Sequence, residues 1–170
     1  MKTIIKNKNG LTLVELISVI VLIGIIATFT SFFLYTGLNG YLNSKNSLEG
    51  ALKAQLALDR ITLELRDISY FSSAPTADSV SFISKDPQLP GLRKLKFQSG
   101  TETGEIRISV DGSEYPLLDN VSLFSLNVIY GNIDDDPSVD EVAAIKIGFK
   151  LAGIGREFRT QIFPRNLVEK

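Results

Sequence analysis

A long apolar run near the N-terminus constrains the possible fold more than any other feature of this sequence. The run extends from Leu11 to Tyr35, and Glu15 is its only formally charged residue. The part that begins at Leu16 is about 20 residues long, and as an α-helix it spans about 30 Å, the hydrocarbon thickness of a bilayer. The sequence therefore predicts one helix that crosses a membrane.

Basic residues lie on one side of this run. Lys2, Lys6 and Lys8 precede it, and the next basic residue after it is Lys45. Because positively charged flanks remain in the cytoplasm, we expect a cytoplasmic N-terminus and a C-terminal domain across the membrane. A secretory signal peptide is an alternative, although its apolar stretch is shorter and residues 27–31 fit an A-x-A-like cleavage site only loosely. A plain membrane anchor explains everything except the glutamate.

The position of Glu15 inside an apolar helix needs a physical reason. A carboxylate at the centre of a spanning helix costs about 2.5 to 3.5 kcal/mol, so such a residue marks a functional site by default. No lysine or arginine lies within a helical turn or two on the apolar side. We therefore expect its partner in another molecule or in a new amino terminus of the chain itself.

The composition excludes most catalytic chemistry. The chain contains no histidine and no cysteine, which removes imidazole acid–base catalysis, thiol nucleophiles, disulfides and metal sites built on nitrogen or sulfur. The formal net charge is -1 and the basic residues are scattered among acids, so no nucleic-acid partner is expected. We predict a protein that is not an enzyme.

The residues around Glu15 resemble a known processing signal. Gly10 to Leu16, with the sequence GLTLVEL, is similar to the class III leader junction of type IV prepilins and of the pseudopilins of type II secretion. The resemblance implies that a prepilin peptidase cuts after Gly10, that Leu11 becomes the N-methylated first residue, and that Glu15 is fifth in the mature chain. Leu11 departs from the phenylalanine that is usual at this position.

The resemblance also implies a cellular setting. A protein of this family is held in the inner membrane with its C-terminal domain in the periplasm. It assembles with other pilin or pseudopilin subunits through an inner-membrane assembly platform, and Glu15 would pair with a neighbouring amino terminus. Segments 58–60, 64–68 and 163–166 resemble minor pilins and the J-type minor pseudopilin, which implies a minor subunit. The open alternative is a single-pass anchored periplasmic binding or sensor domain that never polymerises.

A second helical pattern runs from about 43 to 69, after Gly37 and Gly40 loosen the chain. The two helices are expected to form one rod with a soft point at these glycines. Apolar residues three and four positions apart predict one buried face; they are Ala51, Ala54, Leu58, Ile61, Leu65 and Ile68. We expect this face to pack on a sheet, with a coiled-coil seam as the alternative. The opposite face, which includes Arg60 and Glu64, is expected to be solvated.

Beyond Pro75 the pattern changes from helical to alternating. Six short segments between 79 and 163 alternate apolar and polar residues, and turn-forming residues separate them. Their spacing predicts an antiparallel sheet that the amphipathic helix covers. The predicted fold is α+β, a long N-terminal helix with a transmembrane half and an amphipathic half, packed on an antiparallel β-sheet. This pilin-like architecture divides the chain into a leader (1–10), a transmembrane and assembly helix (11–36) and a periplasmic domain (37–170).

An acidic segment between two predicted strands is a candidate metal site. Oxygen-bearing side chains recur there at alternate positions; they are Asn132, Asp134, Asp136, Ser138 and Asp140. This pattern resembles the first part of an EF-hand loop, and Ca²⁺ takes about six to eight such oxygens. However, Pro137 stands where that loop needs glycine, and Ala143 stands where a bidentate glutamate would close it. A Ca²⁺ site and a solvated acidic loop therefore remain alternatives, and no other cofactor is expected.

Overall fold

The computed structural model describes residues 12–85, 91–133, 140–166, 168 and 169. In this part of the chain one helix, α1 (Leu13–Arg66), is followed by seven strands. The strands are β1 (Ile68–Ser73), β2 (Ser79–Ser84), β3 (Leu92–Gln98), β4 (Gly104–Val110), β5 (Ser113–Gly131), β6 (Glu141–Leu151) and β7 (Glu157–Ile162). The chain forms two compact units, one that ends at Asn46 and one that begins at Ser47.

The first unit contains the apolar part of α1. From Leu13 to Leu38 every residue is exposed, so this stretch buries nothing within its unit. It contains an 18-residue window that is apolar enough to cross a membrane, and no part of that window is buried. A helix that is apolar on all sides is stable only where bilayer lipid or other apolar helices surround it.

Two features of α1 differ from the sequence prediction, its continuity at Gly37 and Gly40 and its C-terminal end. The predicted soft point between Gly37 and Gly40 is absent, because the regular helix continues through both residues. Glycine lowers helix stability by about 1 kcal/mol per site, which a long cooperative helix tolerates. The helix also ends at Arg66 rather than at Ser69, and Ile68 begins β1. Apolar spacing over so few residues fits a strand as well as a helix.

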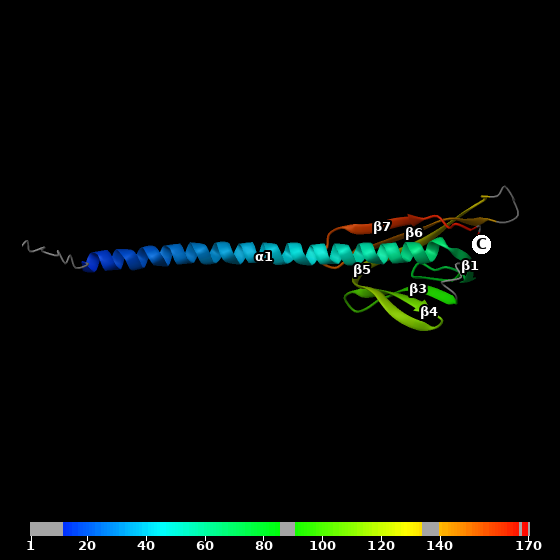
Figure 1. The fold of residues 1–170 in the computed structure, drawn as a ribbon, viewed down its shortest axis with the longest axis horizontal. Helices are drawn as coiled ribbons and strands as arrows, with labels where there is room; N and C mark the ends of the chain where they lie inside the picture. Colours follow the sequence, from blue (N-terminus) through cyan, green and yellow to red (C-terminus); the bar gives the residue numbers. More distant parts are fainter. Residues whose placement is uncertain (1–11, 86–90, 134–139, 167, 170) are drawn as a thin grey trace, which may run out of the picture. The chain divides into compact units, whose positions relative to one another are not determined.

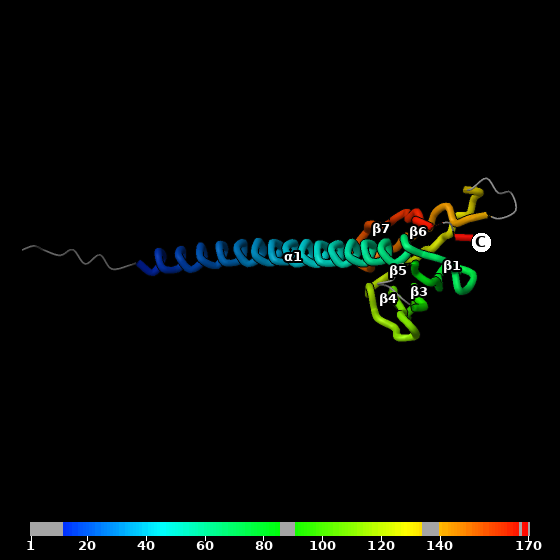
Figure 2. Tube along the Cα trace, turned by 45° about the vertical axis from the view of Figure 1, so that its right-hand side comes forward, coloured from blue at the N-terminus to red at the C-terminus, as the bar shows by residue number. Residues whose placement is uncertain are grey.

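The second unit is an antiparallel meander with the C-terminal part of α1 packed against it (Figure 1). Each of the seven strands pairs with the next along the chain, from β1 at one edge to β7 at the other. The same packing is visible from a second side in the tube view (Figure 2). The predicted α+β fold, a long helix on an antiparallel sheet, is therefore confirmed.

The alternating pattern of the sequence does not predict strand β1 or the first half of strand β5. That pattern predicts no strand at β1, and it predicts β5 only around Leu126 to Tyr130, although the strand begins at Ser113. Register shifts in the β4–β5 pairing beside Pro116, and a left-handed backbone at Asn120 (φ 57°), disturb the first half of β5. Strict alternation cannot reveal a strand that carries such irregularities.

The core of the second unit lies between α1 and the inner face of the sheet. The helix contributes five buried apolar residues, which are Ala54, Ala57, Leu58, Ile61 and Leu65. The sheet contributes the largest fully buried side chains, Phe82 and Phe149. Each buried leucine or isoleucine contributes about 1.5 to 3 kcal/mol. The predicted apolar face thus fixes this part of α1 on the sheet, although Ala51, which was assigned to it, is only half-buried.

Candidate functional site

The N-terminus of α1 is capped by Thr12. Its Oγ1 accepts a hydrogen bond from the backbone N–H of Glu15 (3.3 Å), and its carbonyl oxygen accepts one from the N–H of Leu16 (3.1 Å). Threonine at the cap with glutamate three residues later is the capping-box pattern that starts many helices. Thr12 was not predicted as a cap, although the Thr-x-x-Glu spacing before an apolar run is a readable signal.

Glu15 lies in the first turn of α1, and its side chain is exposed. A carboxylate near a helix N-terminus gains about 0.3 to 1 kcal/mol from the helix dipole. That gain is smaller than the cost of about 2.5 to 3.5 kcal/mol for placing the charge deep in a bilayer. Among the residues that the structure describes, no basic group pairs with Glu15. Local geometry therefore explains only part of its presence.

The predicted cleavage junction, Gly10 and Leu11, lies outside the described residues. The structure describes the chain from Thr12 onwards, where α1 begins after the cap. Cleavage after Gly10 and methylation of Leu11 therefore stay predictions.

The N-terminal segment matches a known family. Residues 5–31 match the prokaryotic N-terminal methylation motif, and this match supports a type IV prepilin-like class III leader. No curated protein and no solved structure matches the chain. The motif and the apolar N-terminal helix together support a type IV pilin- or pseudopilin-like protein. The same helix is consistent with membrane anchoring.

A second charged centre links α1 to the sheet. The predicted position of Glu64 on a solvated face is wrong, because Glu64 is only 2% exposed. Arg93, from β3 and 5% exposed, donates from Nη1 to both carboxylate oxygens of Glu64 at 2.9 and 2.8 Å. Arg60, one helical turn before Glu64, adds an ion pair of 2.5 Å. This buried cluster holds the end of α1 on β3.

The sequence patterns around Glu64 and Arg93 are compatible with burial but do not specify it. Glu64 stands beside Leu65 at the margin of the apolar stripe, where helical periodicity cannot separate buried from exposed positions. Arg93 precedes Leu95 by two residues, so strand alternation places both on the inner face. An arginine is rarely buried unless it is paired, and this pairing becomes apparent only when the helix and the strand are brought together.

The outward face of α1 in the second unit is also less polar than predicted. It carries four leucines spaced four and seven residues apart, each about half exposed or more; they are Leu48, Leu52, Leu56 and Leu63. Spacing of this kind aligns side chains along one face of a helix. A contiguous exposed apolar surface on a folded domain is typical of an interaction site.

The acidic segment is described only at its two ends. Asn132 and Asp140 are exposed, whereas Asp134 and Asp136 lie outside the described residues. Glu141, at the start of β6, is buried, and its Oε2 accepts a hydrogen bond from the backbone N–H of Ile133 (2.8 Å). This bond ties together the two ends of the segment. Within the described ranges no three acidic side chains are grouped so as to hold a metal ion, and the Ca²⁺ site stays a prediction.

Proposed function

We propose that the chain is a minor subunit of a type IV pilus or type II secretion pseudopilus, with a structural and non-enzymatic role. It would be inserted in the inner membrane with a cytoplasmic N-terminus and a periplasmic domain. A prepilin peptidase would then cut after Gly10. The observation that carries this proposal is the methylation motif at residues 5–31, directly joined to an apolar helix that buries nothing in its own unit.

The exposed apolar surface supports assembly through α1. Before assembly a bilayer can cover the stretch from Leu13 to Leu38, and after assembly the helices of neighbouring subunits would replace the lipid. The outward leucines at 48, 52, 56 and 63 would extend this contact into the second unit. Transfer from lipid to a bundle of apolar helices changes the solvation of these side chains little, so the subunit can leave the membrane.

Glu15 would set the position of each subunit along the filament. After cleavage the amino group of Leu11 is a positive charge within an apolar surrounding, and a carboxylate from a neighbouring subunit can neutralise it. An unpaired buried charge is strongly unfavourable, so only alignments that pair the two groups would be stable. Other pilin or pseudopilin subunits and an inner-membrane assembly platform are the partners that this role requires.

The assignment to a minor subunit rests on the resemblance of three short segments. One of them, residues 64–68, includes Glu64, and its contact with Arg93 gives that residue a role in folding. Resemblance at such a position is compatible with shared architecture as well as with shared function. Isolating filaments and comparing the copy number of this chain with that of the most abundant subunit would test this part of the proposal.

The decisive experiment is to identify the N-terminus of the protein made in the presence of a prepilin peptidase. We expect mass spectrometry to find Leu11 as the first residue, carrying a methyl group. A host with a catalytically inactive peptidase is the control, and there the chain should keep Met1 and the lysines. Intact Met1 in the presence of the active peptidase would contradict the proposal.

A non-polymerising anchored periplasmic domain is the second candidate. The cap at Thr12 supports it, because a first-turn glutamate has a local use in starting α1 whether or not a filament forms. Processing and the behaviour of Glu15 variants separate the two candidates.

A further inference from the structure

The seven-stranded sheet has two edges, and they differ in regularity. β1, at one edge, contains two register shifts against β2, and the carbonyl of its first residue, Ile68, accepts a hydrogen bond from the Asn166 side chain (2.9 Å). β7, at the other edge, pairs with β6 in one unbroken register from Glu157 to Ile162 and contains no proline or glycine. Proteins usually blunt their exposed sheet edges, for example with bulges, because a regular edge can pair with another chain. By this measure β1 is blunted and β7 is not.

The strand registers identify the backbone groups on the free side of β7. The N–H of Leu126 on β5 donates a hydrogen bond to the carbonyl of Ala77 (3.1 Å), on the side away from β6. Backbone groups alternate sides along antiparallel strands, and the registers from β5 to β7 are unbroken around Leu126. They therefore direct the N–H and C=O groups of Glu157, Arg159 and Gln161 to the free side of β7. In the described part of the chain no backbone group outside the strand pairs bonds to them.

The side chains of β7 divide between the two faces of the sheet. Phe158 and Ile162 belong to the core side, where the Phe158 ring stacks on Phe149 with a centroid distance of 5.7 Å. Arg159 and Gln161 are exposed on the outer side. A strand added beside β7 continues this alternation. It therefore needs apolar side chains toward the core side and polar side chains toward the outer side, at alternate positions.

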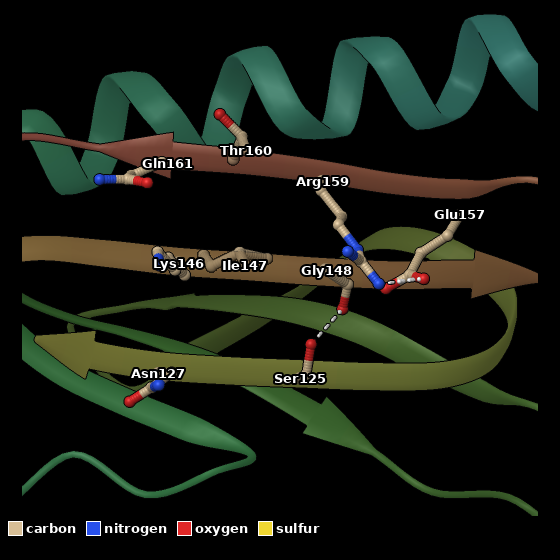
Figure 3. Close-up of a pocket in the computed structure, with 9 residues that line it drawn as sticks. All are labelled: Ser125, Asn127, Lys146, Ile147, Gly148, Glu157, Arg159, Thr160 and Gln161. Carbon is tan, nitrogen blue, oxygen red and sulfur yellow. Dashed lines mark hydrogen bonds and ion pairs between the residues drawn. The ribbon is translucent and has the colours of Figure 1, made fainter.

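The outer face beside β7 carries an excess of positive charge. A depression of about 550 Å³ lies there (Figure 3), and its lining includes Ser125, Lys146, Gly148, Glu157 and Arg159. Arg159 forms an ion pair of 2.7 Å with Glu157, so these two charges offset each other. Lys146 and Lys150 on β6 add positive charge, and β6 is about 10 Å, or two strand spacings, from a strand added to β7. Because charges act over about 8 Å at physiological ionic strength, the outer side chains of an added strand are expected to be acidic.

The direction of β7 disfavours a second copy of this chain as the added strand. β7 runs in the same direction as the part of α1 in its own unit. Ile154, before β7, lies against Gly50 near the start of this part, and the N–H of Arg165, after β7, donates to the Arg66 carbonyl at its end (2.8 Å). A two-fold dimer would pair β7 with β7 in antiparallel fashion. The helices of the two copies would then run in opposite directions, although both lead back to the same membrane.

We propose that the free edge of β7 binds, by strand addition, an extended segment of a different protein in which apolar residues alternate with acidic ones. The backbone of this segment pairs with the free groups of Glu157, Arg159 and Gln161. Its apolar side chains extend the core side next to Phe158, and its carboxylates lie on the outer side near Arg159. In such complexes main-chain hydrogen bonds supply the affinity and alternate side chains supply the specificity. The contact goes beyond the proposed function, and it is compatible with a minor subunit because it does not repeat from copy to copy.

The test is a binding measurement on the full chain in detergent with synthetic peptides. The probe is a fluorescent peptide of six residues, the length of β7, in which valine alternates with glutamate and both ends are blocked. One control peptide has lysine in place of glutamate, and a second has the same composition with the glutamates in one block. We expect the alternating acidic peptide to bind and both controls to bind more weakly, because the first control reverses the charge and the second removes the alternation.

Gln161→Pro in the receptor locates the site on the edge of β7. Proline removes an N–H on the free side and leaves the pairing with β6 in place, which edge strands tolerate. Binding should fall by about tenfold, because one backbone hydrogen bond is lost and the ring crowds the added strand. Gln161→Ser keeps the N–H and should bind as the parent does. If Gln161→Pro melts well below the parent, Arg159→Glu decides instead, and it should weaken binding of the acidic peptide about fivefold and favour the lysine peptide.

Three results would overturn the proposal. They are no binding of the alternating acidic peptide, equal binding of that peptide and the block peptide, and equal binding to folded Gln161→Pro and Gln161→Ser. A dimer of the parent chain in detergent that Gln161→Pro separates would identify a second copy as the occupant and would also overturn it. The measurement does not depend on cleavage after Gly10. A chain that binds the peptide but keeps Met1 would contradict the proposed function alone, whereas a processed chain that does not bind it would contradict this inference alone.

Discussion

Two glutamates on the same helix have opposite surroundings. Glu64, near the end of α1, is buried and contacts Arg93 and Arg60 of its own chain. Glu15, in the first turn, is exposed, and in the described part of the chain no basic group pairs with it. A carboxylate in apolar surroundings needs a cation or hydrogen-bond donors. The comparison teaches that the second unit supplies the partners of Glu64, whereas the described part of the chain supplies none for Glu15.

The apolar residues of α1 divide in the same way. Those from Ala54 to Leu65 that face the sheet are covered by it, whereas those from Leu13 to Leu38 are covered by nothing in their unit. Both stretches are helical and rich in leucine, isoleucine or alanine, but the second also carries the charged residues Asp59, Arg60 and Glu64. A sheet follows the second stretch in sequence and folds back on its apolar side, so that stretch needs only one apolar face. The first stretch depends on lipid or on other chains.

The largest expected effect is loss of assembly in Glu15→Leu. Removing one member of a buried charge pair costs about 3 to 5 kcal/mol, so the variant should be missing from filaments. By contrast, its insertion into the membrane should improve by about 3 kcal/mol if the site lies deep in the bilayer. Comparing the filament fraction and the membrane fraction of the variant and the parent, at equal cleavage after Gly10, measures both effects.

Glu15→Gln sharpens this test, because glutamine keeps the capping-box pattern with Thr12 and removes only the charge. If the carboxylate pairs with a neighbouring amino group, Glu15→Gln should fail to assemble as Glu15→Leu does. If the role of Glu15 is to start α1, Glu15→Gln should behave as the parent. Equal incorporation of both variants would show that Glu15 sets no contact between subunits, and the anchored-domain alternative would then be favoured.

The second effect concerns Glu64. Glu64→Leu leaves the buried Arg93 without this carboxylate, and we expect the free energy of unfolding to fall by about 3 to 5 kcal/mol. The double variant Glu64→Leu with Arg93→Leu should recover most of the loss, because well-packed apolar residues can replace a buried ion pair. Urea unfolding of the three proteins in detergent measures the difference.

A matched control is Glu105→Gln, which removes a carboxylate that pairs with Arg107 at 2.9 Å on the sheet surface. Exposed pairs contribute about 1 kcal/mol or less, so this change should shift unfolding little. Equal losses in Glu64→Leu and Glu105→Gln would show that burial does not distinguish the two ion pairs. No recovery in the double variant would show that the cavity left by the pair, rather than the unpaired charge, controls stability.

The third effect tests the acidic segment as a Ca²⁺ site. A cation at a hundredfold excess over its Kd stabilises the folded state by about 2.7 kcal/mol, so melting should rise on adding Ca²⁺. Replacing Asp134 and Asp136 by asparagine should abolish the rise, whereas Asp78→Asn, far from the segment in sequence, should not. Identical melting with Ca²⁺ and with chelator would leave the segment as a solvated acidic loop.

The sequence predicts the architecture of this protein better than its charged contacts. Hydrophobic periodicity is a one-dimensional signal, so it locates the apolar run, the buried helical stripe and six of the strands. It fails at β1 and in the first half of β5, where the pattern is short or is disturbed near Pro116 and Asn120. The pairing of Glu64 with Arg93 joins residues from different elements, and no local pattern specifies that contact.

The candidate site shows the same limit. Gly10, Leu11 and Glu15 form a compact local motif, and all three lie within the match at residues 5–31, which supports a prepilin-like leader. Thr12 belongs to the same motif and was also readable from local spacing. The neighbourhood of Ser125, Gly148 and Arg159 was not, because these residues come from three strands and meet only through their register.

The smallest expected effect separates an exposed ion pair from the buried one. The pKa of Glu157 is lowered because Arg159 donates a hydrogen bond to its carboxylate, and the charges of Arg159 and Lys150 act in the same direction. A folded-state pKa below the unfolded value means that the pair stabilises the fold above pH 4.5, the ordinary pKa of the carboxyl. That stabilisation is lost as the pH falls through the folded-state pKa. Because Arg159 is exposed and Glu157 is only half-buried, solvent screens the pair and unfolding should change little with pH in this window. NMR titration of the Glu157 carboxyl is therefore the sensitive measurement. Arg159→Gln should raise this pKa toward 4.5 and Lys150→Gln should raise it less, in the order of their contributions. The same pKa in the parent and in Arg159→Gln would mean that the two side chains are not paired in solution.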